Sequence, residues 1–403
     1  MSAHYSGTAA GVDNLLDAIR IALLADSWTV NLWTTDNSTY ESGWSGIDGS
    51  GKRLHVQKTA ADGTVMYFNL RSITRGVPFE FHNETVSSTV TYEGTTYYYG
   101  EMTGIAINGS TGYDGGVDWD YQPGAPTVYD AEDLKYESIG AAIGDLFNAS
   151  IPFWITINDD TVMVTVEYET DKYHHMAFGC LEKAQDSGWT GGQFYAAEHS
   201  GYDPSYRALA YGQETRLTTG WDQDVYKYNS TFMAFGQNYT AGLYADVDSD
   251  ASWRIIHDDI ILPCHSPSWL SGASIQWYSY SSPSSWCALF LKDTPNTFNS
   301  LSPLCPLYLM IKRSSGRYSH VGYPSGIRFV NILQHDAEDE ISYGTDIWKL
   351  FPADKKDPTY DPYYYAGFAH LIAATSPSAS PSSSLSSSPS STPSSSPSSS
   401  PSS

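Results

Sequence analysis

Two neighbouring runs of residues constrain the fold of this chain more than any other local feature. Residues 151–157 and 162–168 are rich in β-branched and aromatic side chains, and Asn158, Asp159 and Asp160 lie between them. Runs of this kind around a short polar turn are typical of a β-hairpin. Residues 175–181 have the same composition, so we expect a further strand directly after the hairpin.

The composition extends this β character to the whole chain of 403 residues. Tyr and Trp are abundant, at 31 and 12 residues, and they favour pleated surfaces, while 33 Gly and 21 Pro supply turns. Only 16% of the residues are charged, so much of the surface must be neutral. Further strands are expected at residues 28–33, 53–57, 65–71, 89–99, 104–109, 231–235, 255–262, 288–291, 307–312 and 326–332.

The clearest helix signal lies at residues 11–26, where apolar residues recur at helical spacing on one face. Asp13 or Asn14 can accept hydrogen bonds from the free amides of its first turn. A second, short helix is expected at residues 139–148, and the strand at 104–109 is expected to end in an Asn-Gly turn.

These elements predict a mainly β protein in three parts. Residues 1–122 form a helix-on-sheet α+β unit, and a Pro- and Gly-containing break at 122–126 separates it from a β-rich body at 123–375. The body is expected to hold antiparallel sheets or a sandwich, in one or two subdomains. Residues 376–403 are almost entirely Ser and Pro, with Pro377 to Pro401 in one four-residue register, which predicts a disordered tail.

The charge balance argues against two classes of partner. With 21 Lys and Arg against 45 Asp and Glu, the net charge is −24, which repels nucleic-acid phosphates and anionic membrane surfaces. No run of about eighteen apolar residues predicts a membrane span. Because the N-terminal residues lack the apolar segment of a secretory signal peptide, export by that route is not expected.

The cysteines and histidines give no motif for a metal or a reaction. Cys180, Cys264, Cys287 and Cys305 form no CxxC pair, and a disulfide among the last three and buried free thiols both remain open. His174 and His175 are the most obvious metal candidates. Since strand neighbours point to opposite faces, they cannot chelate one ion without a bend.

Two acidic stretches are also candidate sites. Asp114, Asp118 and Asp120 share a Gly-containing loop that could bind Ca²⁺, but the loop lacks the terminal Glu of a calcium-binding loop, so a surface turn is expected. Residues 257–259, His-Asp-Asp, have the groups for acid–base chemistry but precede an apolar run, which favours a structural role. We therefore assign no catalytic, metal-binding or cofactor-binding residue, and expect no cofactor and no enzyme activity.

Aromatic clusters at residues 97–99, 277–280 and 363–365 could stack on sugar rings. Aromatic runs in strands belong more often to cores and subunit contacts, which is the interpretation we favour.

Three stretches resemble known proteins in their order and residues. The first runs from the N-terminal helix and the strands after it, through residues 103–108, to Trp-Asp-Tyr-Gln-Pro-Gly-Ala-Pro at 119–126. The second is residues 151–166 with residues 173–179, which end in Met-Ala-Phe-Gly. The third is residues 332–369, with Tyr-Tyr-Tyr-Ala-Gly-Phe-Ala. Together they are similar to uncharacterised virion structural proteins of tailed bacteriophages. The resemblance implies assembly into a particle and supplies no reaction and no functional residues.

The first hypothesis is therefore a structural component of a phage virion, associated with the tail or baseplate. It would bind other virion proteins and further copies of itself, be made in the host cytoplasm and leave by lysis. Two alternatives stay open: a protein on the virion that binds a host glycan or receptor, and a polysaccharide depolymerase.

Overall fold

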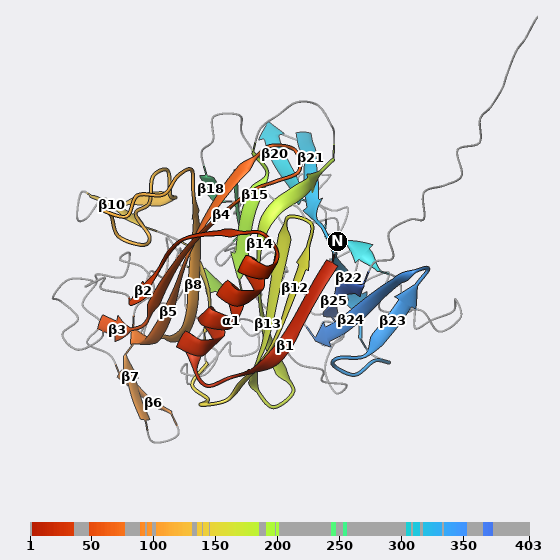
Figure 1. Ribbon diagram of the computed structural model, residues 1–403, viewed down its shortest axis with the longest axis horizontal. Coiled ribbons are helices and arrows are strands. Elements are labelled where there is room, and N and C mark those ends of the chain that lie inside the picture. Colours follow the sequence, from red (N-terminus) through yellow and green to blue (C-terminus); the bar gives the residue numbers. More distant parts are fainter. Residues whose placement is uncertain are drawn as a thin grey trace, which may run out of the picture.

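The computed structural model describes residues 2–35, 48–76, 89–92, 95–98, 102–130, 135–138, 140–144, 146–184, 191–197, 199–200, 243–246, 253–255, 304–307, 309–314, 317–332, 334–352 and 366–373. Within these residues the chain is mainly β, with antiparallel sheets and a helix near the N-terminus (Figure 1). This confirms the predicted fold class.

The first sheet, sheet I, has the predicted hairpin at its centre. β12 and β13 pair from Phe153–Val166 to Asn158–Thr161, around a turn at Asp159 and Asp160. In spatial order its strands are β1 (Ser2–Ala9), β12 (Ile151–Asn158), β13 (Thr161–Glu169), β14 (Lys172–Lys183), β15 (Gln193–Ala197), β17 (Leu243–Asp246) and β18 (Trp253–Ile255). The hairpin of β20 (Leu309–Ser314) and β21 (Arg317–Pro324) joins the end of β14.

The second sheet, sheet II, is built mostly from the strands expected in the N-terminal part. In spatial order they are β16 (His199–Ser200), β11 (Ala141–Ile143), β8 (Met102–Ser110), β5 (Val65–Gly76), β4 (Lys52–Thr59) and β2 (Thr29–Thr35), with β3 (Asp48–Ser50) also paired to β5. Two separate hairpins, β6 (Thr89–Tyr92) with β7 (Thr95–Tyr98) and β9 (Thr127–Asp130) with β10 (Lys135–Ser138), lie outside this sheet.

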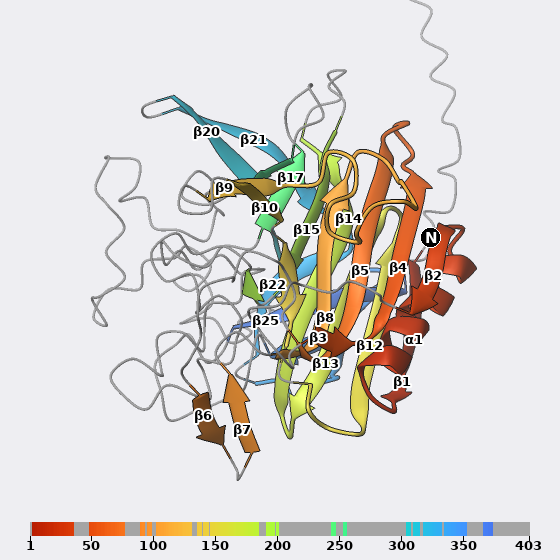
Figure 2. The same ribbon diagram turned by 90° about the vertical axis from the view of Figure 1, so that its left-hand side faces the viewer.

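Sheets I and II pack face to face around one core. The rings of Phe68 on β5 and Phe178 on β14 are 5.1 Å apart, and Trp28 lies 6.0 and 5.9 Å from them. The helix α1 (Val12–Ala25) connects β1 of sheet I to β2 of sheet II and lies at one side of both sheets (Figure 2). Its buried residues are the predicted apolar face: Val12, Leu15, Leu16, Ile19, Ala22 and Leu23.

A third sheet, sheet III, covers the other face of sheet I. Its order is β19 (Cys305–Pro306), β22 (Ile327–Asn331), β25 (Ala366–Ala373), β24 (Asp346–Pro352) and β23 (Glu340–Tyr343). Trp154 of β12 packs on Phe351 of β24 at a ring distance of 5.0 Å, and Asn158 Nδ2 donates to the Leu371 carbonyl at 3.0 Å. Since sheet I is covered on both faces, the charged residues of β12 to β14 lie only toward the strand ends.

Two local predictions were wrong. Residues 141–143 of the predicted helix form β11, because Gly140 and Gly144 disfavour a helix and the apolar residues between them pair with β8. The Asn108-Gly109 pair does not turn the chain. It continues β8, opposite Asn69 and Phe68 of β5, and the Asn108 side chain is buried in hydrogen bonds.

The helix start also differs from the prediction. Gly11 occupies the cap position with φ of 94°, and it has no side chain to accept a hydrogen bond. Asp13 instead accepts a hydrogen bond from the Ser72 hydroxyl at 2.5 Å, which ties the helix to β5.

The segments before and after the predicted boundary at residue 122 contribute strands to the same sheet and residues to the same core. β1 pairs along its length with β12, and the shared core contains residues from Ala9 to Ala197. Residues 122–126 fold back on β8, where the Thr111 amide donates to the Pro123 carbonyl at 2.8 Å. This run is therefore a turn within the unit formed by sheets I and II.

Several predictions fall outside the described residues: the strands at 231–235 and 288–291, most of the strand at 255–262, and the Ser/Pro tail at 376–403. In the described part of the chain, no helix has the length and apolar character needed to cross a membrane.

Candidate functional site

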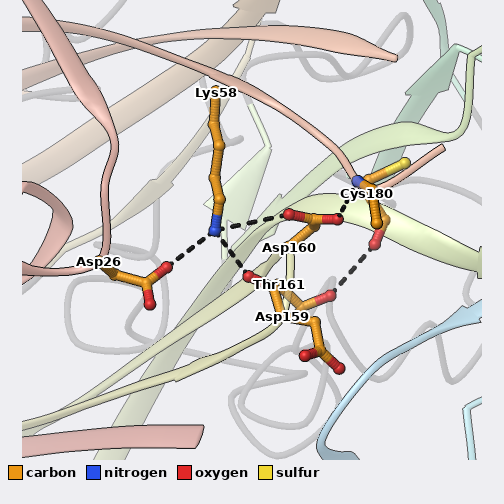
Figure 3. Close-up of polar contacts among 7 residues, drawn as sticks. Asp26, Lys58, Asp159, Asp160, Thr161 and Cys180 are labelled. Atoms are coloured by element: carbon orange, nitrogen blue, oxygen red, sulfur yellow. Dashed lines mark hydrogen bonds and ion pairs between the residues drawn. The ribbon is translucent and has the colours of Figure 1, made fainter. Parts of the chain in front are cut away.

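A lysine surrounded by oxygen atoms joins the helix to both large sheets. We call Lys58, Asp26, Asp159 and Asp160 the lysine cluster (Figure 3). Lys58 belongs to β4, Asp26 follows α1, and the other two form the β12–β13 turn. The Lys58 Nζ lies 2.8 Å from Asp26 Oδ2, 2.8 Å from the Asp159 carbonyl oxygen and 3.5 Å from Asp160 Oδ1.

The same turn is held by β14. The Cys180 amide donates to the Asp160 carbonyl at 2.9 Å, and the Thr161 hydroxyl donates to the Cys180 carbonyl at 3.2 Å (Figure 3). Gly179 has φ of 143°, and a Cβ at this position would overlap the Asp160 carbonyl oxygen. Only glycine therefore allows β14 to approach the turn this closely.

The chemistry of the lysine cluster is that of a clamp. An ammonium group has three donors, and three oxygens lie around Lys58 Nζ, so the amine is engaged rather than poised as a nucleophile. Lys183 and Asp62 form a second ion pair nearby. Burial raises the pKa of Asp62, but hydrogen bonds from Lys183 and Thr64 and the charge of Lys183 outweigh it, and the pKa is lowered.

A buried polar ladder crosses the outer face of sheet II. His55 Nδ1 and Asn69 Oδ1 are 2.8 Å apart, and Asn69 Nδ2 donates to Asn108 Oδ1 at 2.9 Å and to Ser110 Oγ at 3.1 Å. The Asn108 amide donates in turn to the Asp120 carbonyl at 2.9 Å. Such ladders satisfy buried polar groups and fix strand register, which is a structural role.

The loop considered for calcium is closed by an amide. The Gln122 Nε2 lies 3.0 Å from the carbonyls of both Asp114 and Asp118, and its Oε1 accepts from the Asp114 amide at 2.8 Å. Asp120 is buried and bonded to Ser138, whereas Asp114 and Asp118 are exposed. The Gln122 side chain thus occupies the point where the loop carbonyls converge, and the three carboxylates do not meet.

His174 and His175 point to opposite faces of β14, as predicted. The His174 ring stacks on Tyr168 at 3.9 Å, and its Nδ1 lies 3.2 Å from the Gly144 carbonyl. His175 faces sheet III, with its Nε2 2.8 Å from the Pro352 carbonyl. No group of three His, Cys, Asp or Glu side chains that could hold a metal ion occurs in the described part of the chain.

The contact between sheets I and III contains two further histidines that the sequence did not single out. His370 of β25 is fully buried, and its Nε2 lies 3.3 Å from Thr165 Oγ1. His4 of β1 is partly buried, with Nδ1 3.1 Å from Thr156 Oγ1. We call His4, His175 and His370 the histidine layer.

Burial governs the protonation of this layer. It lowers the pKa of His175 to about 4, against a raising effect of the hydrogen bond to the Pro352 carbonyl. It also lowers the pKa of His370 well below its usual value, and the charges of His175, His4 and Lys349 add to this. For His4, burial and Lys349 lower the pKa, and Glu340 and Glu338 oppose them.

The remaining candidates are only partly described. The Cys180 thiol is buried, and its Sγ lies 3.9 Å from the Gly191 carbonyl oxygen. Residues 257–259, Cys264, Cys287 and the aromatic clusters at 277–280 and 363–365 lie outside the described residues, and the side chains of Cys305, Tyr97 and Tyr98 are likewise not described.

Neither the lysine cluster nor the histidine layer could be predicted from a local sequence pattern, since each joins residues far apart in the chain. One signal was present: β12 to β14 have charged residues only toward their ends, and such an uncharged middle is typical of a strand covered on both sides. Comparison of the chain with protein-family models and with curated protein sequences finds no match to either.

Proposed function

We propose that this chain is a structural component of a tailed-phage virion, associated with the tail or baseplate, that works through protein–protein assembly. Its partners are other virion proteins and further copies of itself. It is made in the host cytoplasm and released with the particle by lysis. Three stretches resemble such proteins and support the phage assignment: the N-terminal helix and the strands after it to residue 126, residues 151–166 with 173–179, and residues 332–369.

The observation that carries the assembly role is the edge of sheet I. β1 pairs with β12 and ends the order of strands in the described sheet. It has no Asp, Glu, Lys, Arg or Pro, its pairing is free of bulges, and Ser6, Gly7 and Thr8 are exposed. Since natural sheets protect free edges with charges, prolines or bulges, an edge without them is suited to pair with another chain.

The interior polar groups support the same role. The lysine cluster and the ladder of His55, Asn69 and Asn108 bind partners within the protein. The lysine cluster joins the helix to the two large sheets, and the ladder connects neighbouring strands of sheet II, which suits a protein with a structural role.

Charge on the edge strand tests the proposal. Thr8→Lys places a charge on the exposed part of β1, and Val117→Lys places the same charge on the exposed loop between β8 and β9 as a matched control. We expect both variants to fold, and Thr8→Lys alone to be depleted from purified particles when it competes with the unaltered chain. Equal incorporation of the two variants would show that the edge of β1 is not an assembly contact.

Binding to host cells tests the rival roles in the same preparation. If the purified chain binds host glycans, the receptor-binding alternative replaces the assembly proposal. If it releases reducing ends from host polysaccharide, the depolymerase alternative replaces it.

A further inference from the structure

The histidine layer lies where sheet III packs on sheet I. Besides the histidines, the contact contains Trp154 of β12, Tyr173 of β14 and Phe351 of β24, whose rings are 5.0 to 6.0 Å apart. Trp154 Nε1 donates to Glu338 Oε2 at 2.9 Å. This small aromatic cluster and a few polar contacts hold sheet III, whereas sheets I and II share a far larger apolar core.

Only one assignment of donors and acceptors satisfies all the hydrogen bonds of the histidine layer. The Pro352 carbonyl can only accept, so His175 Nε2 carries its hydrogen and, in the neutral ring, Nδ1 accepts. Thr165 Oγ1, at 2.9 Å, therefore donates to His175 Nδ1. The same hydroxyl then accepts from His370 Nε2 at 3.3 Å.

This chain of donors works only when both rings are neutral. A proton added to His175 Nδ1 would make this atom a donor opposite the Thr165 hydroxyl, which is already donating, so the hydrogen bond between them would be lost. A proton added to His370 Nδ1 would create a buried donor at an atom that has no hydrogen-bond partner within the described residues. An unpaired buried charge is costly, and the two rings are only 6.3 Å apart, so their positive charges would also repel.

The charged groups around the layer do not offset these costs. Lys349 of β24 faces His370 and His4 and adds positive charge. Glu338 and Glu340 act on His4 at the rim and pair with Lys349 at 3.7 and 3.2 Å. Around His175 lie the neutral groups Thr165, Pro352 and Phe368.

We propose that the histidine layer is a pH-sensitive latch: protonation of His175 and His370 in mildly acidic solution releases sheet III from sheet I, before the core shared by sheets I and II unfolds. The latch does not depend on the proposed virion role, because all its contacts lie within one chain.

The size of the effect follows from linkage between protonation and release. With a pKa of about 4 when docked and an ordinary histidine value of about 6.5 when released, His175 alone raises the equilibrium constant for release about 20-fold between pH 7 and pH 5. His370 acts in the same direction.

Hydrogen exchange of the full chain between pH 7 and pH 5 tests the latch, with rates corrected for the pH dependence of intrinsic exchange. We expect the protection of the β22 and β25 amides to fall by about 20-fold or more relative to the β4 and β5 amides in sheet II. Parallel changes in both sets of amides, or none in either, would overturn the proposal.

Variants distinguish the contribution of His175 and His370 to the pH response from that of other titrating groups. His175→Gln should lose the 20-fold part of the change, and His370→Gln should lose its own part, so two variants are available if one fails to fold. His55→Gln is the matched control, since His55 is equally buried but lies on the outer face of sheet II. A full pH response in both interface variants would show that other groups cause it.

Discussion

Replacing Lys58 with Met tests whether the lysine cluster is a structural clamp. The change keeps most of the aliphatic stem and removes an ammonium that lies 2.8 Å from Asp26 Oδ2 and from the Asp159 carbonyl. The side chains of Lys58, Asp26 and Asp160 are only 16%, 21% and 17% exposed. Without the ammonium, the carboxylates of Asp26 and Asp160 would therefore lack their positive partner, and little water would screen their charges.

The expected magnitude lies between two limits. Removing one partner of a fully buried ion pair costs about 3–5 kcal/mol, and removing an exposed pair costs about 0–1 kcal/mol. With three acceptors and mostly covered side chains, we expect Lys58→Met to lower the free energy of unfolding by about 2–4 kcal/mol. Urea unfolding monitored by circular dichroism measures this change.

An exposed lysine gives the control. Lys172 pairs with Glu169 at 2.6 Å, with side chains 34% and 44% exposed, so Lys172→Met should cost under about 1 kcal/mol. A double-mutant cycle of Lys58→Met with Asp26→Asn should show coupling, because the second change removes one of the stranded carboxylates. Equal losses for Lys58→Met and Lys172→Met, with no coupling, would refute the clamp.

Three further predictions follow from particular contacts. Gly179→Ala should destabilise the protein by roughly 3 kcal/mol or more in urea, because its Cβ would strike the Asp160 carbonyl, whereas Gly63→Ala, at φ of 88° in open space, should cost only about 1 kcal/mol. Gln122→Ala should speed proteolytic cleavage between residues 111 and 126, because the loop carbonyls lose their shared donor; unchanged cleavage would count against this role. Unfolding in urea should become easier as pH falls from 6.5 to 4: the folded pKa of His175 lies below the unfolded one, so the unfolded chain binds more protons in this window, and His175 should account for about 3 kcal/mol of lost stability, which a flat profile would contradict.

The elements that the sequence predicted well are those with strong local signals. The helix at Val12–Ala25 has its apolar residues at helical spacing, and the β12–β13 hairpin has a polar turn between two β-rich runs. For the helix, the buried face could be inferred from spacing alone, whereas the hairpin strands are buried on both faces.

The errors arose where tertiary contacts outweighed a local signal. Asn108-Gly109 has the composition of a turn, but Asn108 is stabilised in β8 by the ladder to Asn69 and Asp120. β1 was missed because its residues are polar and small, and its place is set by pairing with β12, about 150 residues away. Sequence periodicity carries no information about such a partner.

The candidate sites were hidden for the same reason. The residues of the histidine layer come from β1, β14 and β25, and those of the lysine cluster from three separate segments. The opposite orientation of His174 and His175 could be predicted from strand geometry, but the meeting of His175 with His370 depends on how sheet III docks.

The virion assignment can be tested by quantitative mass spectrometry of purified particles. Particles would be collected from the lysate in which this chain is made, separated on a density gradient and washed at high salt. We expect the chain to stay with the particles at a fixed copy number relative to their other structural proteins. If the protein is absent from the particles and remains in the soluble lysate, it is not a structural component of the virion.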